Sequence, residues 1–302
     1  MRIASTQYSA TMNDALQQAS GKLEDIMQQI SSGKRILRPS DDPIASVRLT
    51  RLDQEDNAIT QYRSNIAALR SRLQDNETAM SSLNKDLLQV RDTLVSASDG
   101  TNTPADLNAM ATPLAALRDS LLATANRQDS EGRYQFGGTA TSQAPIAFNP
   151  AAPAGSRYTF QGNTDKQLVV VGNGVTQPGN VSVEEMAALL NTLDSTIATM
   201  ASPTVVNDAT THAVVAASVT AVDTAMTSIE GKITVLGGIQ NSLSTPDDNH
   251  ASVALSNQQA AITLGQTDYN KAAVELNGYT TAVQAAQKAY GRVSQLSLFS
   301  AL

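Results

Sequence analysis

The stretch ITQYRSNIAALRSRLQDNETAMSSLNKDLLQVRDTL, residues 59–94, decides the fold of this 302-residue chain. Steps of three and four residues alternate along it, and one polar residue interrupts the otherwise apolar set Ile59, Tyr62, Ile66, Leu69, Leu73, Asn76, Met80, Leu83, Leu87, Val90 and Leu94. A 3.5-residue period sustained this long is typical of a coiled-coil-like helix. Asp42 and Pro43 predict its start, as an N-cap followed by proline at the first helical position, and Gly100 predicts its end.

The same spacing recurs on both sides of this stretch. Residues 12–30, 107–121 and 219–243 each carry an apolar stripe that predicts a further amphipathic helix. From Leu255 to Tyr290 an apolar residue returns every seven positions, which predicts one C-terminal helix. The chain is therefore expected to be mainly α, with a long coiled-coil-like helical bundle formed by both chain ends.

The middle of the chain has a different pattern. Arg157–Gln161 alternates like a half-buried strand, and Leu168–Val171 reads as a buried one. Glycine and proline residues recur along the segment and indicate turns. Ser182 with Glu185 predicts a capping box at the start of a helix. These features predict an inserted mixed, β-containing domain.

The pattern divides the chain into five segments. We expect an N-terminal helix and loop for assembly at 1–42, and the first part of a helical domain at 43–137. The inserted domain is expected at 138–211, the return part of the helical domain at 212–250, and a C-terminal assembly helix at 251–302.

Composition excludes several classes of function. With 28 acidic and 21 basic residues the net charge is −7, which gives the whole chain no electrostatic reason to bind nucleic acid. The absence of cysteine excludes disulfides, thiolate metal sites and a cysteine nucleophile. His212 and His250 have no helical partner at the spacing of a metal pair. We therefore expect no enzyme activity, no cofactor and no metal. We also expect no membrane insertion, because the purely apolar runs are only a few residues long.

The terminal stripes leave three possibilities open. The segments 1–31 and 251–297 can pair with each other, with the long helix, or with other subunits. If other helices already cover the long helix, exposed apolar stripes remain, and such stripes mark oligomerisation surfaces. The first residues lack the apolar segment of a cleaved secretion signal, so the chain is either cytoplasmic or exported by another route.

Two motif runs and the C-terminal pattern carry a resemblance to a known family. SGKRI at 32–36 is followed by PSDDP at 39–43, and GRYQFGG stands at 132–138. Together with the C-terminal pattern of residues 268–302, these runs resemble the flagellin-like axial proteins of the bacterial flagellum. The motif residues are Gly33, Arg35, Pro39, Ser40, Asp41, Asp42, Pro43, Gly132, Arg133, Tyr134, Phe136 and Gly138.

Within that family the chain most resembles the hook-associated proteins of the hook–filament junction, because of the DDP run at 41–43 and the SLF run at 297–299. The resemblance implies a non-enzymatic structural subunit that joins hook to filament as a ring, in the extracellular part of the flagellum. A short flagellin that forms the filament itself is the alternative. An enzyme or small-ligand binder built on the middle domain is a third reading, and the lack of any catalytic motif opposes it.

The resemblance also implies partners. These are flagellin, a neighbouring hook-associated protein, further copies of the chain, and an export chaperone. The resemblance also implies that the flagellar type III apparatus exports the chain unfolded and that the N-terminal export signal is not cleaved. The terminal helices would be disordered in the free monomer and fold against neighbours. The expected subunit-assembly residues are Met12, Leu16, Leu23, Ile26, Ile30, Leu276, Tyr279, Val283, Tyr290, Val293, Leu298 and Phe299. The expected chaperone contacts are Leu276, Tyr279, Val283 and Tyr290.

Overall fold

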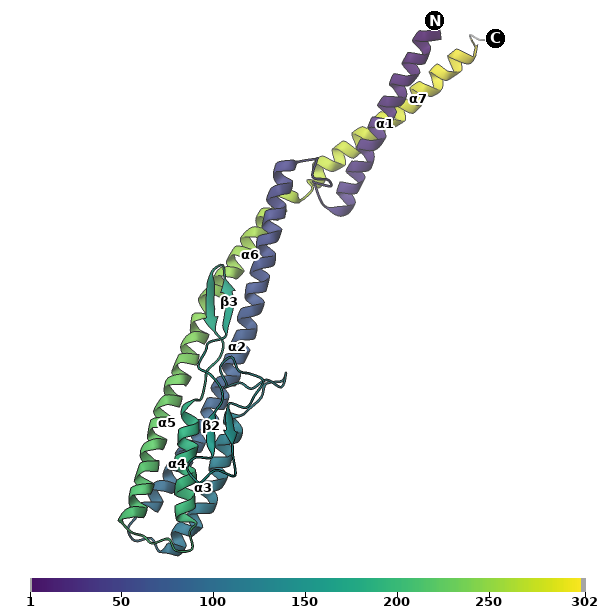
Figure 1. Cartoon of the computed structure of the whole chain (residues 1–302). Coiled ribbons are helices and arrows are strands. Elements are labelled where there is room, and N and C mark those ends of the chain that lie inside the picture. Colours follow the sequence, from purple (N-terminus) through teal and green to yellow (C-terminus); the bar gives the residue numbers. More distant parts are fainter. Residues whose placement is uncertain (1, 300–302) are drawn as a thin grey trace. The chain divides into compact units, whose positions relative to one another are not determined.

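The computed structural model describes the backbone of residues 2–299 and the side chains of residue 7 and residues 10–292. The chain forms two compact units, which we call the terminal unit (residues 1–59 and 251–302) and the central unit (residues 60–250). Helices predominate in both units, as the sequence predicts (Figure 1).

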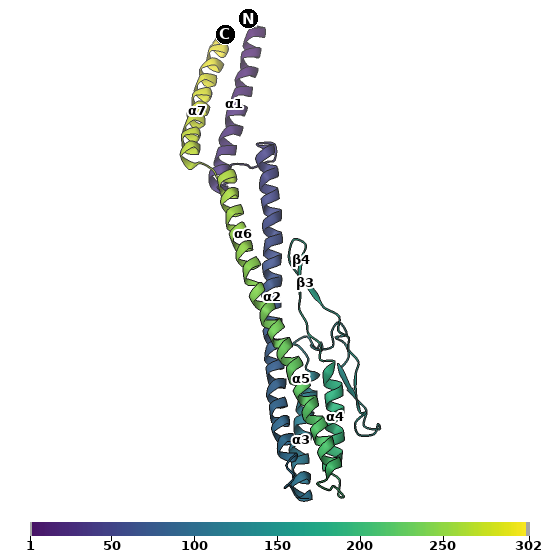
Figure 2. The same ribbon diagram turned by 90° about the vertical axis from the view of Figure 1, so that its left-hand side faces the viewer.

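The terminal unit contains both chain ends. Its elements are α1 (Arg2–Ser32), the first part of α2 (Pro43–Ala97), the last part of α6 (Ser244–Gly265) and α7 (Tyr269–Phe299). Helices α1 and α7 lie side by side with the two chain ends at the same end of the pair, so they run antiparallel (Figures 1 and 2).

The central unit is a helical bundle with a small β region. Its helices are the rest of α2, α3 (Pro104–Ala125), α4 (Glu185–Met200), α5 (Ala209–Ser242) and the start of α6. The β region has two antiparallel two-stranded sheets. One pairs β1 (Ile146–Phe148) with β2 (Tyr158–Phe160), and the other pairs β3 (Leu168–Gly172) with β4 (Val175–Pro178). The expected strands at 157–161 and 168–171 are confirmed.

The heptad stripe of α2 forms the core of the central unit. Its residues from Ile66 to Leu94 are all buried, including the polar Asn76. Leucines of α3, the apolar face of α4 and residues of α5 complete one continuous core with them. Core packing is therefore what the long heptad pattern encodes.

Side-chain oxygens cap several of the helices, and at α7 the Asp268 carboxylate accepts the backbone N–H of Lys271. Asp42 accepts the backbone N–H of Ala45 at the start of α2, and Asp208 accepts that of Thr211 at the start of α5. Thr103 and Asp106 form a reciprocal capping box at α3. The predicted start of the long helix at Asp42 and Pro43 is confirmed.

Two local predictions are wrong. The expected single helix through Leu255–Tyr290 ends at Gly265, and α7 begins at Tyr269. The capping box of Ser182 and Glu185 does not form, because the Glu185 carboxylate binds the ammonium of Lys232 on α5 at 2.6 Å and the Ser182 hydroxyl bonds to Glu184.

The stretch Ala209–Gly265 is long and apolar enough, by length and composition only, to cross a membrane. The sequence expectation that no such helix exists is wrong by this criterion. The apolar residues Val215, Val222, Ile229 and Leu236 are nevertheless buried in the protein core. Core packing accounts for part of the apolar character of this stretch, since 28% of its most apolar window is buried.

Candidate assembly interface

The predicted assembly residues of α1 and α7 meet within one chain. On α1, Ile26 is buried and Met12, Leu16, Leu23 and Ile30 are half-buried. On α7, Leu276, Tyr279 and Val283 are half-buried, whereas Tyr290 is 45% exposed. The side chains of Val293, Leu298 and Phe299 lie outside the described residues. Within this one chain, α1 lies against α7, which is the first of the three pairings, and the part of 251–297 that forms α6 lies beside α2, which is the second.

The seam between α1 and α7 is loosely filled. Met12 and Leu16 of α1 line a cavity of about 190 Å³ together with Gln287 and Tyr290 of α7. Among the described residues of the terminal unit, the buried apolar side chains are Ile26, Ala45, Ile59 and Ala272. A unit with so little buried apolar surface gains little hydrophobic stabilisation on its own.

The first motif run forms a structure that we call the loop clasp, made of residues 33–42 and 264–268. The Arg35 backbone N–H donates to the Gly265 carbonyl at 2.8 Å, and the Thr267 N–H donates to the Gly33 carbonyl at 2.9 Å. Gly33 has φ +69°, and a Cβ there would lie 3.1 Å from the Tyr269 hydroxyl. Glycine is needed here because other residues would be strained in this conformation.

Charged side chains tighten the loop clasp. The Arg35 guanidinium pairs with Asp42 at 3.1 Å. Asp41 accepts the backbone N–H groups of Leu37 and Arg38 at 3.0 and 2.8 Å. The Ala45 N–H, and after it the Arg35 side chain, lower the pKa of Asp42 below its ordinary value. Pro39 and Ser40 are exposed in the same loop. These motif residues thus join the α1–α2 loop to the α6–α7 loop.

The terminal unit also exposes apolar residues that the heptad reading missed. Ile44 is 78% exposed, Val47 70%, Val274 74% and Met27 58%. They fall outside the 3.5-residue phase, so a search for periodic stripes passes over them. Their signal in the sequence is an apolar residue on the polar side of an amphipathic helix.

A groove lies between α2 and α6 in the terminal unit. It has a volume of about 1000 Å³, with Leu52, Leu255 and Leu264 among its apolar lining and Arg48 and Arg51 among its polar lining. Leu255, which belongs to the predicted C-terminal stripe, is 67% exposed. The groove and these exposed apolar residues are apolar surface that one copy of the chain leaves open to water.

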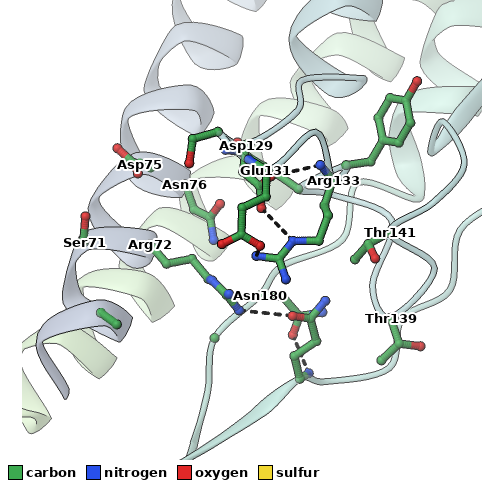
Figure 3. A pocket seen from close by; sticks show the side chains of 16 residues that line it. Ser71, Arg72, Asp75, Asn76, Asp129, Glu131, Arg133, Thr139, Thr141 and Asn180 are labelled. Carbon is green, nitrogen blue, oxygen red and sulfur yellow. Dashed lines mark hydrogen bonds and ion pairs between the residues drawn. The ribbon is translucent and has the colours of Figure 1, made fainter. Parts of the chain in front are cut away.

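The second motif run lies in the central unit. Gly132 and Gly138 have φ +76° and +72°, and Phe136 is fully buried. Arg133 pairs with Asp129 at 3.1 Å and Glu131 at 2.8 Å, and the Tyr134 N–H donates to the Thr141 carbonyl. This run therefore shapes the chain where it leaves α3, and it lines a polar pocket (Figure 3).

Among the described residues, no group of three or more His, Cys, Asp or Glu could hold a metal ion. His250 bonds through Nε2 to the Val171 carbonyl at 2.8 Å and stacks on Tyr62 at 5.4 Å. His212 lies in α5. His250 thus links α6 to strand β3 and to Tyr62 of α2.

Comparisons with known proteins agree with this geometry. The model of the bacterial flagellin N-terminal helical region matches residues 3–141. The chain is 30% identical over 289 residues to flagellar hook-associated protein 3 of Escherichia coli K12, covering 90% of both chains. The solved structure of a flagellar hook-associated protein of Vibrio parahaemolyticus matches at 33% identity and TM-score 0.67, covering 74% of this chain and 99% of that one.

A more distant structure shares the fold. The flagellar junction protein FlgL from Legionella pneumophila matches with a TM-score of 0.56 at 13% identity, over 72% of this chain and 100% of that one. The flagellin-type model ends at 141, whereas the hook-associated relative aligns over nearly the whole chain.

Proposed function

Because the chain belongs to the flagellar hook-associated protein 3 family, we propose that it builds its junction as a ring of copies held together through the terminal unit. It is a structural, non-enzymatic component of the extracellular bacterial flagellum at the hook–filament junction. The observation that carries the proposal is the exposed apolar surface of the terminal unit, at Ile44, Val47, Leu255 and Val274.

Burial of apolar surface between copies supplies the hydrophobic stabilisation that a single copy lacks. Ordering a residue costs about 1–2 kcal/mol of backbone entropy, and burial returns about 25 cal/mol per Å² of apolar surface. The terminal unit fully buries few apolar side chains in its described part, so neighbours must offset this cost. We therefore expect α1 and α7 to be disordered in the free monomer and to become ordered on assembly.

Passage through a type III export channel fits the covalent make-up of the chain. The sequence contains no cysteine, so no disulfide has to be broken before the chain crosses a narrow channel unfolded. We propose that an N-terminal export signal directs the chain to this route and is not cleaved.

An export chaperone would bind the C-terminal helix. Leu276, Tyr279, Val283 and Tyr290 lie on α7, which packs against α1 in the structure. A chaperone that grips these four residues must take the place of α1, which would block premature association. The other proposed partners are flagellin on one side of the ring and another hook-associated protein on the other.

Deleting the gene in its flagellated host tests the proposal. We expect hooks that end without filaments, together with unassembled flagellin in the medium. Normal filaments on the deletion strain would contradict a junction role.

The short-flagellin alternative has its own test. Purified chain that polymerises alone into long filaments would support the alternative. Chain that stays monomeric, or stops at short closed oligomers, would support the junction ring.

A further inference from the structure

The sequence contains two asparagine–glycine pairs, and the structure places them in different backbone settings. Asn173–Gly174 forms the turn between β3 and β4 in the central unit, whereas Asn277–Gly278 lies inside helix α7 of the terminal unit. All four of these residues are exposed. The functions proposed above assign no role to either pair.

The fold requires glycine in the first pair but not in the second. Gly174 has φ +70°, a conformation that other residues rarely adopt. Gly278 has no positive φ, and a Cβ there would meet no atom of another element within 4 Å. Because glycine is also a poor helix former, alanine at 278 would fit α7 better than the residue that is present.

An asparagine followed by glycine can lose ammonia without an enzyme, and asparagine is accordingly a thermolabile residue. The backbone nitrogen of the glycine gives up its proton and attacks the side-chain carbonyl carbon, Cγ, of the asparagine. The side-chain nitrogen leaves as ammonia, and a succinimide ring remains. Water then opens the ring at Cγ, which gives aspartate, or at the backbone carbonyl carbon, which gives isoaspartate. Glycine favours the attack because no Cβ shields its nitrogen.

The helical conformation of α7 opposes this attack at Asn277. In an α-helix each N–H donates to the carbonyl of the residue four positions earlier, so the Gly278 N–H is engaged. The carbonyl of the same peptide group, at Asn277, accepts the Thr281 hydroxyl at 2.8 Å. The Leu276 carbonyl before it accepts the Thr280 hydroxyl at 2.7 Å. The peptide group that must rotate to bring its nitrogen onto Cγ is therefore held by hydrogen bonds at both ends.

Given the proposed function, in which α7 is disordered in a free copy and ordered in an assembled one, we propose that Asn277 is a site of spontaneous deamidation that folding of α7 prevents. The pair reacts in copies that remain unassembled and is protected in the ring. Isoaspartate adds one methylene to the backbone between Leu276 and Tyr279, two of the expected assembly residues. The regular hydrogen-bond pattern of a helix cannot continue through that insertion. A free copy that ages in this way loses its ability to assemble.

The first test compares the reaction with the order of α7 in the free full-length chain. Peptide mass spectrometry gives the deamidation rate at Asn277, expressed relative to its rate in guanidinium chloride, and amide exchange of α7 is measured on the same sample. We expect a ratio near one where the α7 amides exchange freely and a ratio about tenfold lower where they are protected. Fast reaction with protected amides, or slow reaction with freely exchanging amides, would overturn the proposal.

The same experiment distinguishes failure of the gate from failure of the proposed function. Slow reaction together with protected amides in the free chain would contradict the disorder expected of a free copy and would support protection by the helix. Absence of the chain from flagella would contradict the ring and leave the free-chain comparison standing.

Glycine substitutions in α7 separate the helix from the dipeptide. Gly291→Ala strengthens the same helix and leaves the pair intact, whereas Gly278→Ala removes the pair without a clash. We expect Gly278→Ala to slow reaction at Asn277 about tenfold even in denaturant, and Gly291→Ala to slow it only in buffer. Asn173 should react at one rate in all these proteins. A Gly291→Ala chain with better protected α7 amides and an unchanged rate at Asn277 would overturn control by the helix.

Isolated flagella provide the assembled state. We expect about tenfold less isoaspartate at 277 in copies from flagella than in free chain of the same age, and equal amounts would overturn the proposal. Asn277→Asp adds the charge of the product at this exposed position without lengthening the backbone. It should restore filaments in the deletion strain, and loss of filaments would overturn the assignment of the damage to the added methylene.

Discussion

The guanidinium of Arg35 donates two hydrogen bonds to the carbonyl oxygen of Leu264, at 2.9 Å from Nη2 and 3.2 Å from Nε, across a sequence separation of 229 residues. This contact ties the loop after the first helix to the end of α6, within the terminal unit. A residue from the N-terminal motif run therefore helps to determine where α6 ends and α7 begins.

Replacing Arg35 by alanine should loosen the loop clasp. Hydrogen bonds from charged groups contribute about 1.5–3 kcal/mol, and exposure of the Arg35 side chain places this case at the low end. We expect amide exchange at Thr267 to become about tenfold faster, with no change in the central unit. Arg48→Ala is the matched control, because Arg48 is exposed and makes no ion pair with the described residues. Unchanged exchange at Thr267 in Arg35→Ala would show that the clasp does not depend on this side chain.

Removing the Asp194 carboxylate should destabilise the central unit. Asp194 is 2% exposed and pairs with Arg118 at 2.9 Å and Arg157 at 3.4 Å. Asp194→Ala leaves the half-buried Arg157 guanidinium and the Gly155 N–H without this acceptor, while Arg118 keeps its pair with Asp119, so we expect a loss of about 1–3 kcal/mol in urea unfolding. The control Asp223→Ala breaks only the exposed pair with Arg91 and should cost under about 1 kcal/mol. Similar losses in the two variants would contradict this ranking.

Acid should weaken the helix caps. The Thr211 N–H above all lowers the pKa of Asp208, and the Thr103 hydroxyl lowers that of Asp106, from an ordinary value of 3.8. Stability from a lowered carboxyl pKa is fully present above the unfolded value and is lost as the pH falls through the folded value. The free energy of unfolding should therefore stay level from pH 7 to about 5 and fall below about 3.8.

Asp208→Asn isolates one of these caps. Asparagine is a good N-cap that does not titrate, so stability near pH 7 should change little while the loss in acid becomes smaller. Urea unfolding curves of both proteins across this pH range provide the measurement. Identical pH dependence in the two proteins would rule out a contribution from this cap.

The sequence pattern predicts those features of a helix that depend on residues near one another in the chain. The stripe of α2 specifies its own buried face, and Asp42 with Pro43 specifies its start, because both signals are local. The break between α6 and α7 escapes the pattern, since Ile262 and Tyr269 keep the seven-residue spacing across it. The α6–α7 loop is bonded to Gly33 and Arg35, and no local signal reports such distant contacts.

The candidate sites divide in the same way. Met12, Leu16 and Val283 were predictable as members of stripes, and they lie on the α1–α7 pair. Ile44 and Val274 were not, because their exposure depends on which helix faces the structure leaves uncovered. Asn76 gave a sequence signal, as an interruption of the stripe, but its polar surroundings come from the distant loop 129–141.

The central claim, assembly through the terminal helices, is tested most directly by Val283→Asp expressed in the deletion strain. Val283 is half-buried on α7, so a carboxylate there should cost about 1–3 kcal/mol in each copy while leaving the unfolding of the central unit unchanged. The neighbouring Gln284→Asp adds the same charge at an exposed position of the same helix and is the control. The measurement is the fraction of cells with filaments. We predict that Gln284→Asp restores filaments and Val283→Asp does not; normal filaments with Val283→Asp would contradict assembly through this helix.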